Sequence, residues 1–219
     1  MKQCILIGGG NTTNPNNPYE TEHIDKRIVE LANKEQPIFL YIGLANSYAD
    51  SRYDHIKKIF QNLKCQTQYL KKNNVIHNPK IVEEKINNAD IIYIDGGDTL
   101  KLLDYVKKYS IDILLKKAYE KGTILVGKSA GAILLSKAGL SDSYILRGEK
   151  STYEFVEGLN IESIIICPHY TKEKQSIIKD KLKKKEIVYG IPNQTALVIK
   201  DHIIDKIEIE NEQVKIIER

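Results

Sequence analysis

The sequence predicts an α/β fold in which a mostly parallel β-sheet is covered by helices on both faces. Short runs rich in Ile and Val recur along the chain, and such runs are typical of buried parallel strands. Longer charged stretches separate them, and their apolar side chains recur at about 3.6-residue spacing. Because strand and helix signals alternate, parallel strands joined by helical crossovers are favoured.

The individual elements follow from these patterns. The C-terminal stretch from Thr195 to Ile217 alternates apolar and polar residues and predicts a terminal hairpin pair with a turn near Asn211. The Asn- and Pro-rich segment Asn11–Tyr19 is expected to be irregular. The expected strands are Cys4–Ile7, Ile38–Ile42, Ile91–Ile94, Thr123–Val126, Ile164–Cys167 and Ala196–Ile199. Helices are expected within Tyr53–Leu63, Leu100–Tyr109, Ile111–Glu120, Ala132–Ala138 and most of Cys167–Glu186.

Composition excludes several functional classes. The 219 residues carry a net charge of +4, which is too small and dispersed to favour a nucleic-acid partner, and the basic run Lys179–Lys185 is expected on a solvated helix face. The first apolar run is too short for a signal peptide or a membrane span, so we expect a cytoplasmic protein without membrane contact. We expect a single domain over residues 1–219.

Metal and cofactor sites are also disfavoured. The three cysteines have no metal-like spacing, so neither zinc nor a disulfide framework is expected. Gly8–Gly10 follows the first predicted strand, as in dinucleotide-binding proteins. The glycine pattern is not completed, because position 13 is Thr13. We therefore expect no metal and no cofactor.

The sharpest chemical feature is Gly127–Ala132, which reads GKSAGA and stands between a predicted strand and a predicted helix. G-x-S-x-G in this position is typical of a nucleophile elbow, where small neighbours allow a sharp turn around the serine. Ser129 would then lie at a helix N-terminus that favours developing negative charge. The alternative is a glycine-rich turn in which Ser129 only caps the helix. The two glycines and two alanines exceed what a cap requires.

A nucleophilic serine needs a base, and His169 is the best-placed histidine. It follows the predicted strand Ile164–Cys167, while Ser129 follows another predicted strand. Sites in open α/β sheets lie at the carboxyl ends of strands, so both side chains could reach one crevice. The other histidines are expected at the surface: His23, His55, His77 and His202.

A carboxylate that orients the histidine is expected between Ser129 and His169. Asp142 is the candidate because it follows Gly139 in a predicted loop, where a short side chain can be held rigidly. Its alternative role is to cap a turn. The remaining acidic candidates in this stretch are Glu149, Glu154, Glu157 and Glu162.

Two backbone segments could form an oxyanion hole. The N–H of Ala130 directly follows the candidate nucleophile and is the natural first donor. A second donor could come from Asp95–Thr99, whose glycines allow close approach to a substrate oxygen. The alternative is a tight strand-to-helix turn capped by Asp98 or Thr99.

With these segments in view, the chain resembles peptidase family S51, which includes aspartyl dipeptidase (peptidase E) and cyanophycinase. The resemblance runs from the first strand to about Ile199 and is closest to a bacterial peptidase E-like branch. The segments that carry it are Gly96–Thr99 with Leu102 and Leu103, Gly127–Ala132, Pro168–Tyr170, and Gly190–Pro192 with Ala196–Val198.

The resemblance implies a fold like that of class I glutamine amidotransferases, with serine where those enzymes use cysteine. It also implies a role for each matching residue: Ser129 is the nucleophile, His169 the base, Gly97 and Ala130 the oxyanion donors, and Asp142 the acid. Two departures stand out. Asp98 occupies a position where asparagine is common, and Asn193 with Gln194 replaces an acidic residue, so the assignment of the acid rests on Asp142 alone.

The predicted function is a serine-type peptidase that cleaves small peptides through an acyl-enzyme on Ser129. Dipeptides with an N-terminal aspartate are one expected substrate class, and Arg147 or Lys128 could pair with a substrate carboxylate. Two alternatives stay open: a non-catalytic amidotransferase-like binding domain, and a cyanophycinase-like hydrolase of aspartyl polymers. The sequence also leaves the oligomeric state open between a monomer and a homodimer.

Overall fold

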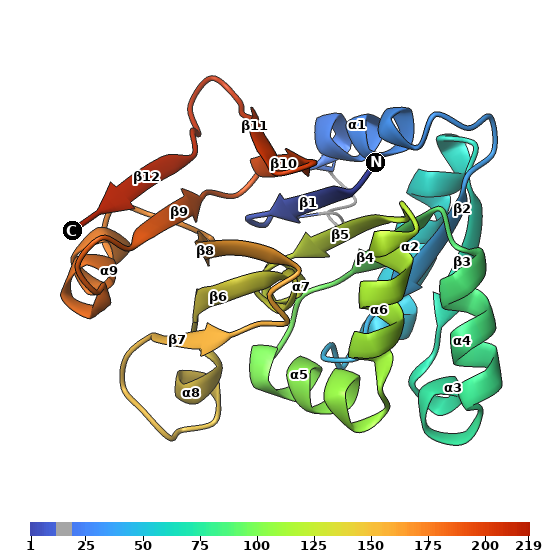
Figure 1. Cartoon of the computed structure of the whole chain (residues 1–219), viewed down its shortest axis with the longest axis horizontal. Helices are drawn as coiled ribbons and strands as arrows, with labels where there is room; N and C mark the ends of the chain where they lie inside the picture. The colour runs from blue at the N-terminus through green and yellow to red at the C-terminus, as the bar shows by residue number, and fades with distance from the viewer. Residues whose placement is uncertain (12–18) are drawn as a thin grey trace.

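The structure is a computed structural model that describes residues 1–11 and 19–219 (Figure 1). Of the segment Asn11–Tyr19, predicted to be irregular, only the two end residues belong to the described part. Among the described helices, none is long and apolar enough to cross a membrane.

A seven-stranded sheet forms the larger part of the described chain, in the order β11-β10-β1-β5-β4-β2-β3. The strands from β1 to β3 in this order run parallel, whereas β10 and β11 are antiparallel additions at one edge. Every residue of β1, β4 and β5 is buried, as expected for central strands covered on both faces. The bounds are β1 Gln3–Ile7, β2 Ile38–Ile42, β3 Gln66–Leu70, β4 Ile91–Ile94, β5 Ile124–Lys128, β10 Ala196–Lys200 and β11 Ile203–Ile207.

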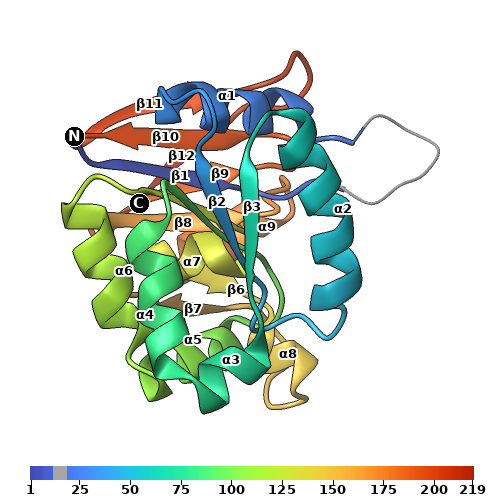
Figure 2. The same ribbon diagram turned by 90° about the vertical axis from the view of Figure 1, so that its right-hand side faces the viewer.

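Helices cover both faces of this sheet (Figure 2). Apolar residues of α1 and α2 pack against one set of alternating strand residues, which includes Ile5, Ile7 and Phe39. Apolar residues of α3 to α6 pack against the opposite set, which includes Leu6 and Leu40. The bounds are α1 Glu22–Ala32, α2 Ala49–Asn62, α3 Lys72–His77, α4 Pro79–Asn88, α5 Thr99–Lys108 and α6 Ile111–Glu120.

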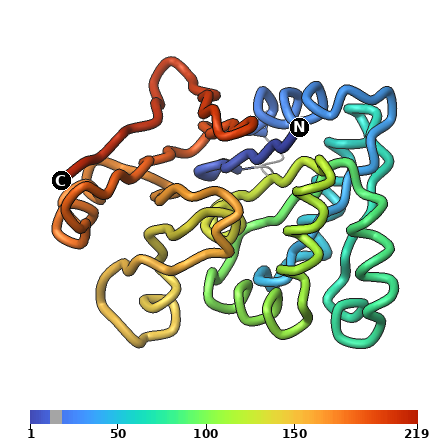
Figure 3. The backbone as a smooth tube through the Cα atoms, in the orientation of Figure 1, coloured from blue at the N-terminus to red at the C-terminus, as the bar shows by residue number. Residues whose placement is uncertain are grey.

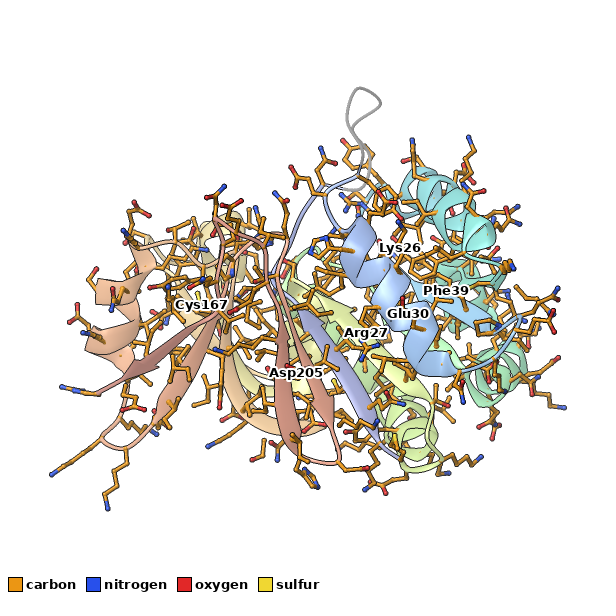
Figure 4. All side chains as sticks on the ribbon, turned by 90° about the horizontal axis from the view of Figure 1, so that it is seen from above. Lys26, Arg27, Glu30, Phe39, Cys167 and Asp205 are labelled. Carbon is orange, nitrogen blue, oxygen red and sulfur yellow. The ribbon has the colours of Figure 1, made fainter. Side chains whose placement is uncertain are left out.

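The amphipathic character of α1 shows how these helices are placed. Its buried residues include Ile24 and Ile28, whereas Lys26, Arg27 and Glu30 are exposed on its outer side, above the sheet that contains Phe39 (Figure 4). Burial of one apolar stripe holds the helix on the sheet.

A second sheet of five strands lies beside the first, in the order β12-β9-β8-β6-β7 (Figure 1). Here β6, β8 and β9 are parallel, while β7 and β12 are antiparallel edges. Helix α7 contacts strands of both sheets, and α9 packs Ile178 against the second sheet. The bounds are β6 Ser136–Ser141, β7 Glu154–Glu157, β8 Glu162–Pro168, β9 Ile187–Ile191, β12 Lys215–Glu218, α7 Ala130–Leu135, α8 Ser143–Leu146 and α9 Lys174–Lys181.

The predicted fold class is confirmed, and each predicted strand overlaps a strand of the structure. The sequence predicts one sheet, whereas the structure divides the strands between two. The chain forms most of the first sheet, crosses to the second, returns through β10 and β11, and leaves again to β12 (Figure 3). The strands missed by the sequence analysis are β3, β6, β7 and β9.

Two predicted helices end differently in the structure. The one expected over Ala132–Ala138 ends at Leu135, because the Ser136 hydroxyl bonds the carbonyls of Ile133 and Ala138 while the chain turns into β6. The one expected over Cys167–Glu186 is limited to α9, since Cys167 and Pro168 are buried at the end of β8.

The C-terminal hairpin prediction is correct for β10 and β11, which pair antiparallel. The chain also turns near Asn211, where Ile209 bridges Glu212. The last strand, however, pairs with β9 in the second sheet, because this pairing buries Ile217 in the apolar cluster under α9.

Candidate active site

Three segments converge on the carboxyl end of β1. The carbonyl of Ile7 accepts the N–H of Ser129, the carbonyl of Gly8 accepts that of His169, and the carbonyl of Gly9 accepts that of Gln194, each at 3.0 Å. Consecutive carbonyls of one strand end therefore hold a residue from each of three loops. These backbone bonds alone fix the relative positions of the three loops.

Ser129 occupies a strained turn between β5 and α7. Its φ is 55° and its ψ is −114°, a conformation rare for a residue with a side chain. The flanking glycines are required by close packing: a Cβ at Gly127 would lie 2.3 Å from the Gly131 carbonyl oxygen, and one at Gly131 would lie 2.1 Å from that of Ile94. The serine therefore lies in the sharp turn expected of a nucleophile elbow, and its side chain makes no capping bond to α7.

Ser129, His169 and Asn193 form a hydrogen-bonded chain. The Ser129 Oγ lies 2.8 Å from His169 Nε2, and Asn193 Oδ1 lies 2.7 Å from His169 Nδ1. With an amide oxygen at Nδ1, that nitrogen carries the proton and donates it, so Nε2 is left as the acceptor for the serine hydroxyl. This is the tautomer that a general base requires.

The side chain bonded to Nδ1 of His169 is that of Asn193, and not that of Asp142, the acid proposed from the sequence. Asp142 follows β6 and precedes α8, and it lines the cavity that also contains Ser129 and His169. Its negative charge is felt by His169, but the oxygen bonded to Nδ1 belongs to the asparagine. Sequence analysis missed Asn193 because a polar residue after a strand and a proline carries no local signal of its partner.

Gly8 and Gly9 make room for this arrangement. A Cβ at Gly9 would lie 2.2 Å from Asn193 Oδ1 and 2.3 Å from His169 Cε1, and one at Gly8 would lie 2.1 Å from the Pro192 carbonyl oxygen. Gly9 therefore faces the side chains of His169 and Asn193, whereas Gly8 faces the backbone that leads to Asn193. The glycines Gly8 and Gly9 thus allow two loops to pack against the end of β1, a role unrelated to dinucleotide binding.

The two predicted oxyanion donors line the same cavity as Ser129 and His169. Ala130 is the first residue of α7, so its N–H belongs to the donors that have no acceptor within the helix. Gly97 has a φ of +134°, and a Cβ there would lie 2.7 Å from the Ala45 carbonyl oxygen. Glycine is thus needed for the backbone to follow the cavity wall at this point.

The cavity has a volume of about 510 Å³, within the range of pockets for small ligands. Its wall comes from the segment that follows β2 and from the carboxyl ends of β4, β5, β6 and β8 with the segments that follow them. The residues with ionisable side chains on this wall are Tyr48, Asp98, Lys101, Asp142, Tyr153, His169 and Lys174.

Asp98 has a structural role on this wall. Its carboxylate accepts the N–H groups of Leu100 and Lys101 at the start of α5 and pairs with Arg147 at 3.0 Å. Partial burial opposes ionisation, but the bonds from Arg147 and Lys101 hold the pKa of Asp98 below its ordinary value. Arg147 is therefore already paired with protein carboxylates, Asp98 and the more distant Asp104.

The electrostatic environment favours a neutral His169. Desolvation of the ring lowers its pKa below the ordinary value, and the nearby cations of Lys174 and Lys128 act in the same direction. The bond to Asn193 and the charge of Asp142 act in the opposite direction without reversing the shift. The histidine is thus available as a base at pH values where an exposed imidazole is partly protonated.

A buried charged cluster lies on the α1 side of the sheet, beside the nucleophile strand. It contains Asp25, Asp95 and Lys128, all at most 4% exposed. Tyr41 donates to Asp95 at 2.7 Å, but Lys128 Nζ and one oxygen of each aspartate have no hydrogen-bond partner. Burial lowers the pKa of Lys128. This lysine does not line the cavity, so the structure does not bring it to a substrate carboxylate there.

Of the other four histidines, His23 contacts the loop of the site: its Nε2 lies 3.0 Å from the Gln194 carbonyl oxygen. His23 is half-buried, whereas the sequence analysis expects it at the surface. Its bond to Gln194 helps to hold the segment that carries Asn193. In the described residues, no group of three or more His, Cys, Asp or Glu could hold a metal ion.

Comparison with known proteins gives a consistent family. The sequence profile of peptidase family S51 matches residues 4–207. The uncharacterized peptidase YgaJ of Bacillus subtilis is 29% identical over 177 residues, which cover 80% of this chain and 71% of YgaJ. Peptidase E of Nostoc sp. is 24% identical over 169 residues, which cover 70% of this chain and 66% of the relative.

Solved structures support the same fold. A peptidase from an acI-B1 Actinobacterium superposes with a TM-score of 0.67 at 26% identity, covering 91% of this chain and 84% of the other. A Listeria monocytogenes EGD-e protein, named for its likeness to peptidase E, superposes with a TM-score of 0.71 at 20% identity, covering 96% of this chain and all of the other. These neighbours have the class I glutamine amidotransferase-like architecture.

The first prediction concerns the asparagine at Nδ1. Asn193→Asp places a carboxylate against the imidazole, so the pKa of His169 should rise by about one unit or more. NMR titration of the ring in both proteins measures the shift. Asn87→Asp, which adds the same charge on exposed α4, is the matched control and should leave the titration in place. An unchanged pKa in Asn193→Asp would contradict the contact.

The second prediction concerns Asp25. Burial raises its pKa to about 7, although the bond from Thr21 and the charge of Lys128 act in the opposite direction. In the unfolded chain an aspartate titrates near about 4. The protonated carboxyl therefore contributes stability at low pH that is lost as the pH rises from about 4 through about 7.

Asp25→Asn should flatten this loss in urea unfolding measured between pH 5 and pH 8. Asp54→Asn, on exposed α2, is the control and should keep the wild-type slope. Equal slopes in wild type and Asp25→Asn would show that Asp25 is ionised throughout.

Proposed function

Because the chain belongs to peptidase family S51, and is therefore a hydrolase of the peptidase class, we propose that it is a serine-type peptidase. In this proposal it cleaves small peptides through an acyl-enzyme on Ser129. The observation that carries the proposal is the 2.8 Å contact between Ser129 Oγ and His169 Nε2 at a strained nucleophile elbow. The serine is activated when the imidazole accepts its proton as the hydroxyl attacks.

The first half-reaction forms the acyl-enzyme. Ser129 Oγ bonds to the carbonyl carbon of the peptide, and its proton passes to His169 Nε2. The carbonyl oxygen becomes an oxyanion, which the N–H groups of Gly97 and Ala130 stabilise from the cavity wall. The C–N bond then breaks, and the amine product leaves with the proton from His169.

Water completes the reaction. His169 takes a proton from the water molecule that attacks the acyl carbon, and Ser129 leaves with that proton as the hydroxyl is restored. Through both steps Asn193 Oδ1 accepts the Nδ1 proton. It keeps Nε2 facing the reacting atoms without adding a negative charge, as in hydrolases whose histidine is oriented by asparagine.

Small peptides are the substrates that best fit the cavity. Its volume of about 510 Å³ suits a ligand of two or three residues. Lys101 and Lys174 lie on its wall and supply positive charge toward carboxylates. Dipeptides with an N-terminal aspartate therefore belong in the first substrate panel, in line with the name peptidase E carried by the Nostoc relative.

The test is a mass-spectrometric screen of short peptides, Asp-initiated ones included, with wild type beside Ser129→Ala. Wild type should release products, and kcat should fall by about a thousandfold or more in Ser129→Ala. Labelling of Ser129 by a fluorophosphonate provides a readout that does not depend on the peptide. Full turnover by Ser129→Ala, or a wild-type Ser129 that is never labelled, would favour the non-catalytic binding domain.

A further prediction tests the close approach of Gly9, which follows β1, to His169 and Asn193. Gly9→Ala should displace His169 and Asn193 from their present positions, since its Cβ would overlap both side chains. A displacement of about 1 Å lowers the rate of such chemistry by about a hundredfold. The rate of Ser129 labelling by the fluorophosphonate measures this loss.

Gly148→Ala is the control for backbone strain without a side-chain clash, because the φ of +69° at Gly148 disfavours alanine while a Cβ there meets nothing within 4 Å. Thermal melts show that each variant is folded. If Gly9→Ala is folded and labels at the wild-type rate, the glycine is not required by the catalytic pair.

A further inference from the structure

Asp142 is held on a rigid segment at the cavity wall. Its neighbours Ser141 and Ser143 are buried, and both hydroxyls bond Thr99: Ser141 Oγ lies 2.9 Å from Thr99 Oγ1, and Ser143 Oγ accepts the Thr99 N–H at 2.8 Å. The two serines also bond one another at 3.0 Å. Side chains on either side of Asp142 therefore fix its backbone to the start of α5.

The Asp142 carboxylate itself is not used by this network. The residue is exposed, and although it stands at the N-cap of α8, its side chain makes no capping bond. Asp98, the other carboxylate on the described cavity wall, caps α5 and is paired with Arg147. Nδ1 of His169 is bonded to Asn193 and not to Asp142. Of the two carboxylates on the described cavity wall, Asp142 is therefore the one available to bind a ligand.

The position of Asp142 relative to the oxyanion loop indicates which ligand group it meets. In a peptide cleaved after its first residue, the α-nitrogen is separated from the reacting carbonyl carbon by only two covalent bonds. The carbonyl oxygen must lie at the N–H groups of Gly97 and Ala130 for the reaction to proceed. Thr99 follows Gly97 by two residues and is bonded to both neighbours of Asp142. The segment of Asp142 is therefore fixed to the loop that carries the Gly97 N–H, and Asp142 lines the same cavity as that N–H.

We propose that Asp142 binds the free α-ammonium group of the substrate and so restricts cleavage to the first residue of a peptide. This inference rests on the proposed function. It replaces the triad role that the sequence suggests for Asp142 with a role in specificity. A charge-assisted bond to an ammonium group favours substrates with a free N-terminus and gives no help to N-acetylated ones.

The placement of Lys174 on the wall agrees with this orientation. Lys174 Nζ donates to the His169 carbonyl oxygen at 2.8 Å and lies 4.8 Å from the Tyr153 ring centroid. It is thus fixed on the histidine side, where the leaving amine departs. A short peptide with its ammonium at Asp142 extends its negatively charged C-terminus toward this cation.

The experiment uses a mixture of dipeptides with each common amino acid first and leucine second, together with the N-acetylated forms, at pH 7. Wild type, Asp142→Asn and Glu149→Gln are compared by mass spectrometry. Glu149 is an exposed acid that follows α8 without lining the cavity, so its variant should behave as wild type. The fluorophosphonate, which carries no amine, reports the reactivity of Ser129 in each protein.

Wild type should cleave free dipeptides in preference to their acetylated forms. In Asp142→Asn, kcat/KM for the free dipeptides should fall by about tenfold to a hundredfold, mainly through KM. The same variant should keep its fluorophosphonate labelling rate within about threefold, because a bond to an ammonium group plays no part in that reaction.

Any of three results would overturn the inference. The first is that wild type, with Ser129 labelled by the fluorophosphonate, shows no preference for free over acetylated dipeptides. The second is that Asp142→Asn keeps the wild-type preference for free dipeptides. The third is that fluorophosphonate labelling and all peptide cleavage fall together in Asp142→Asn, which would indicate that Asp142 positions His169. If wild-type Ser129 is never labelled and no peptide is cleaved, the proposed function itself fails, and the inference fails with it.

Discussion

The carboxyl end of β1 is the constraint on which the site depends. Three successive carbonyls, those of Ile7, Gly8 and Gly9, each accept one backbone N–H from the segments of Ser129, His169 and Gln194. Buried backbone groups must be paired, so these bonds also satisfy the strand end itself. The strand has no room for side chains where the loops meet it, and this explains the glycines at positions 8 and 9.

The asparagine at Nδ1 determines which charge stands beside His169, the candidate base. A carboxylate at this position would stabilise the imidazolium and raise the pKa of His169. Asn193 supplies the orienting oxygen without the charge, while desolvation together with the cations of Lys174 and Lys128 lowers the pKa of the ring. In the proposed mechanism the base therefore has a pKa below that of an exposed imidazole, and more of the transition-state charge is left to the oxyanion donors.

The sequence was most informative where function needs a local pattern. Ser129 could be selected as a candidate because a nucleophile elbow requires glycines at fixed positions around it, and His169 because it directly follows a strongly apolar strand. Asn193 could not, since its partner lies 24 residues away and nothing near it in the chain marks the contact. The division into two sheets was missed for a similar reason: β6, which reads SKAGLS, has little strand character of its own and depends on pairing with β7 and β8.

The second sheet matters because it supplies half of the site. Ser129 and Gly97 follow β5 and β4 of the first sheet, whereas His169, Asn193 and Asp142 follow β8, β9 and β6 of the second. A contact as short as that between Ser129 and His169 therefore spans two sheets, and a small shift between them would break it. The bonds from β1 to His169 and Gln194, together with the packing of α7 against strands of both sheets, prevent such a shift. The alignment of the candidate catalytic groups is thus a property of the junction between the sheets, and no single loop can set it alone.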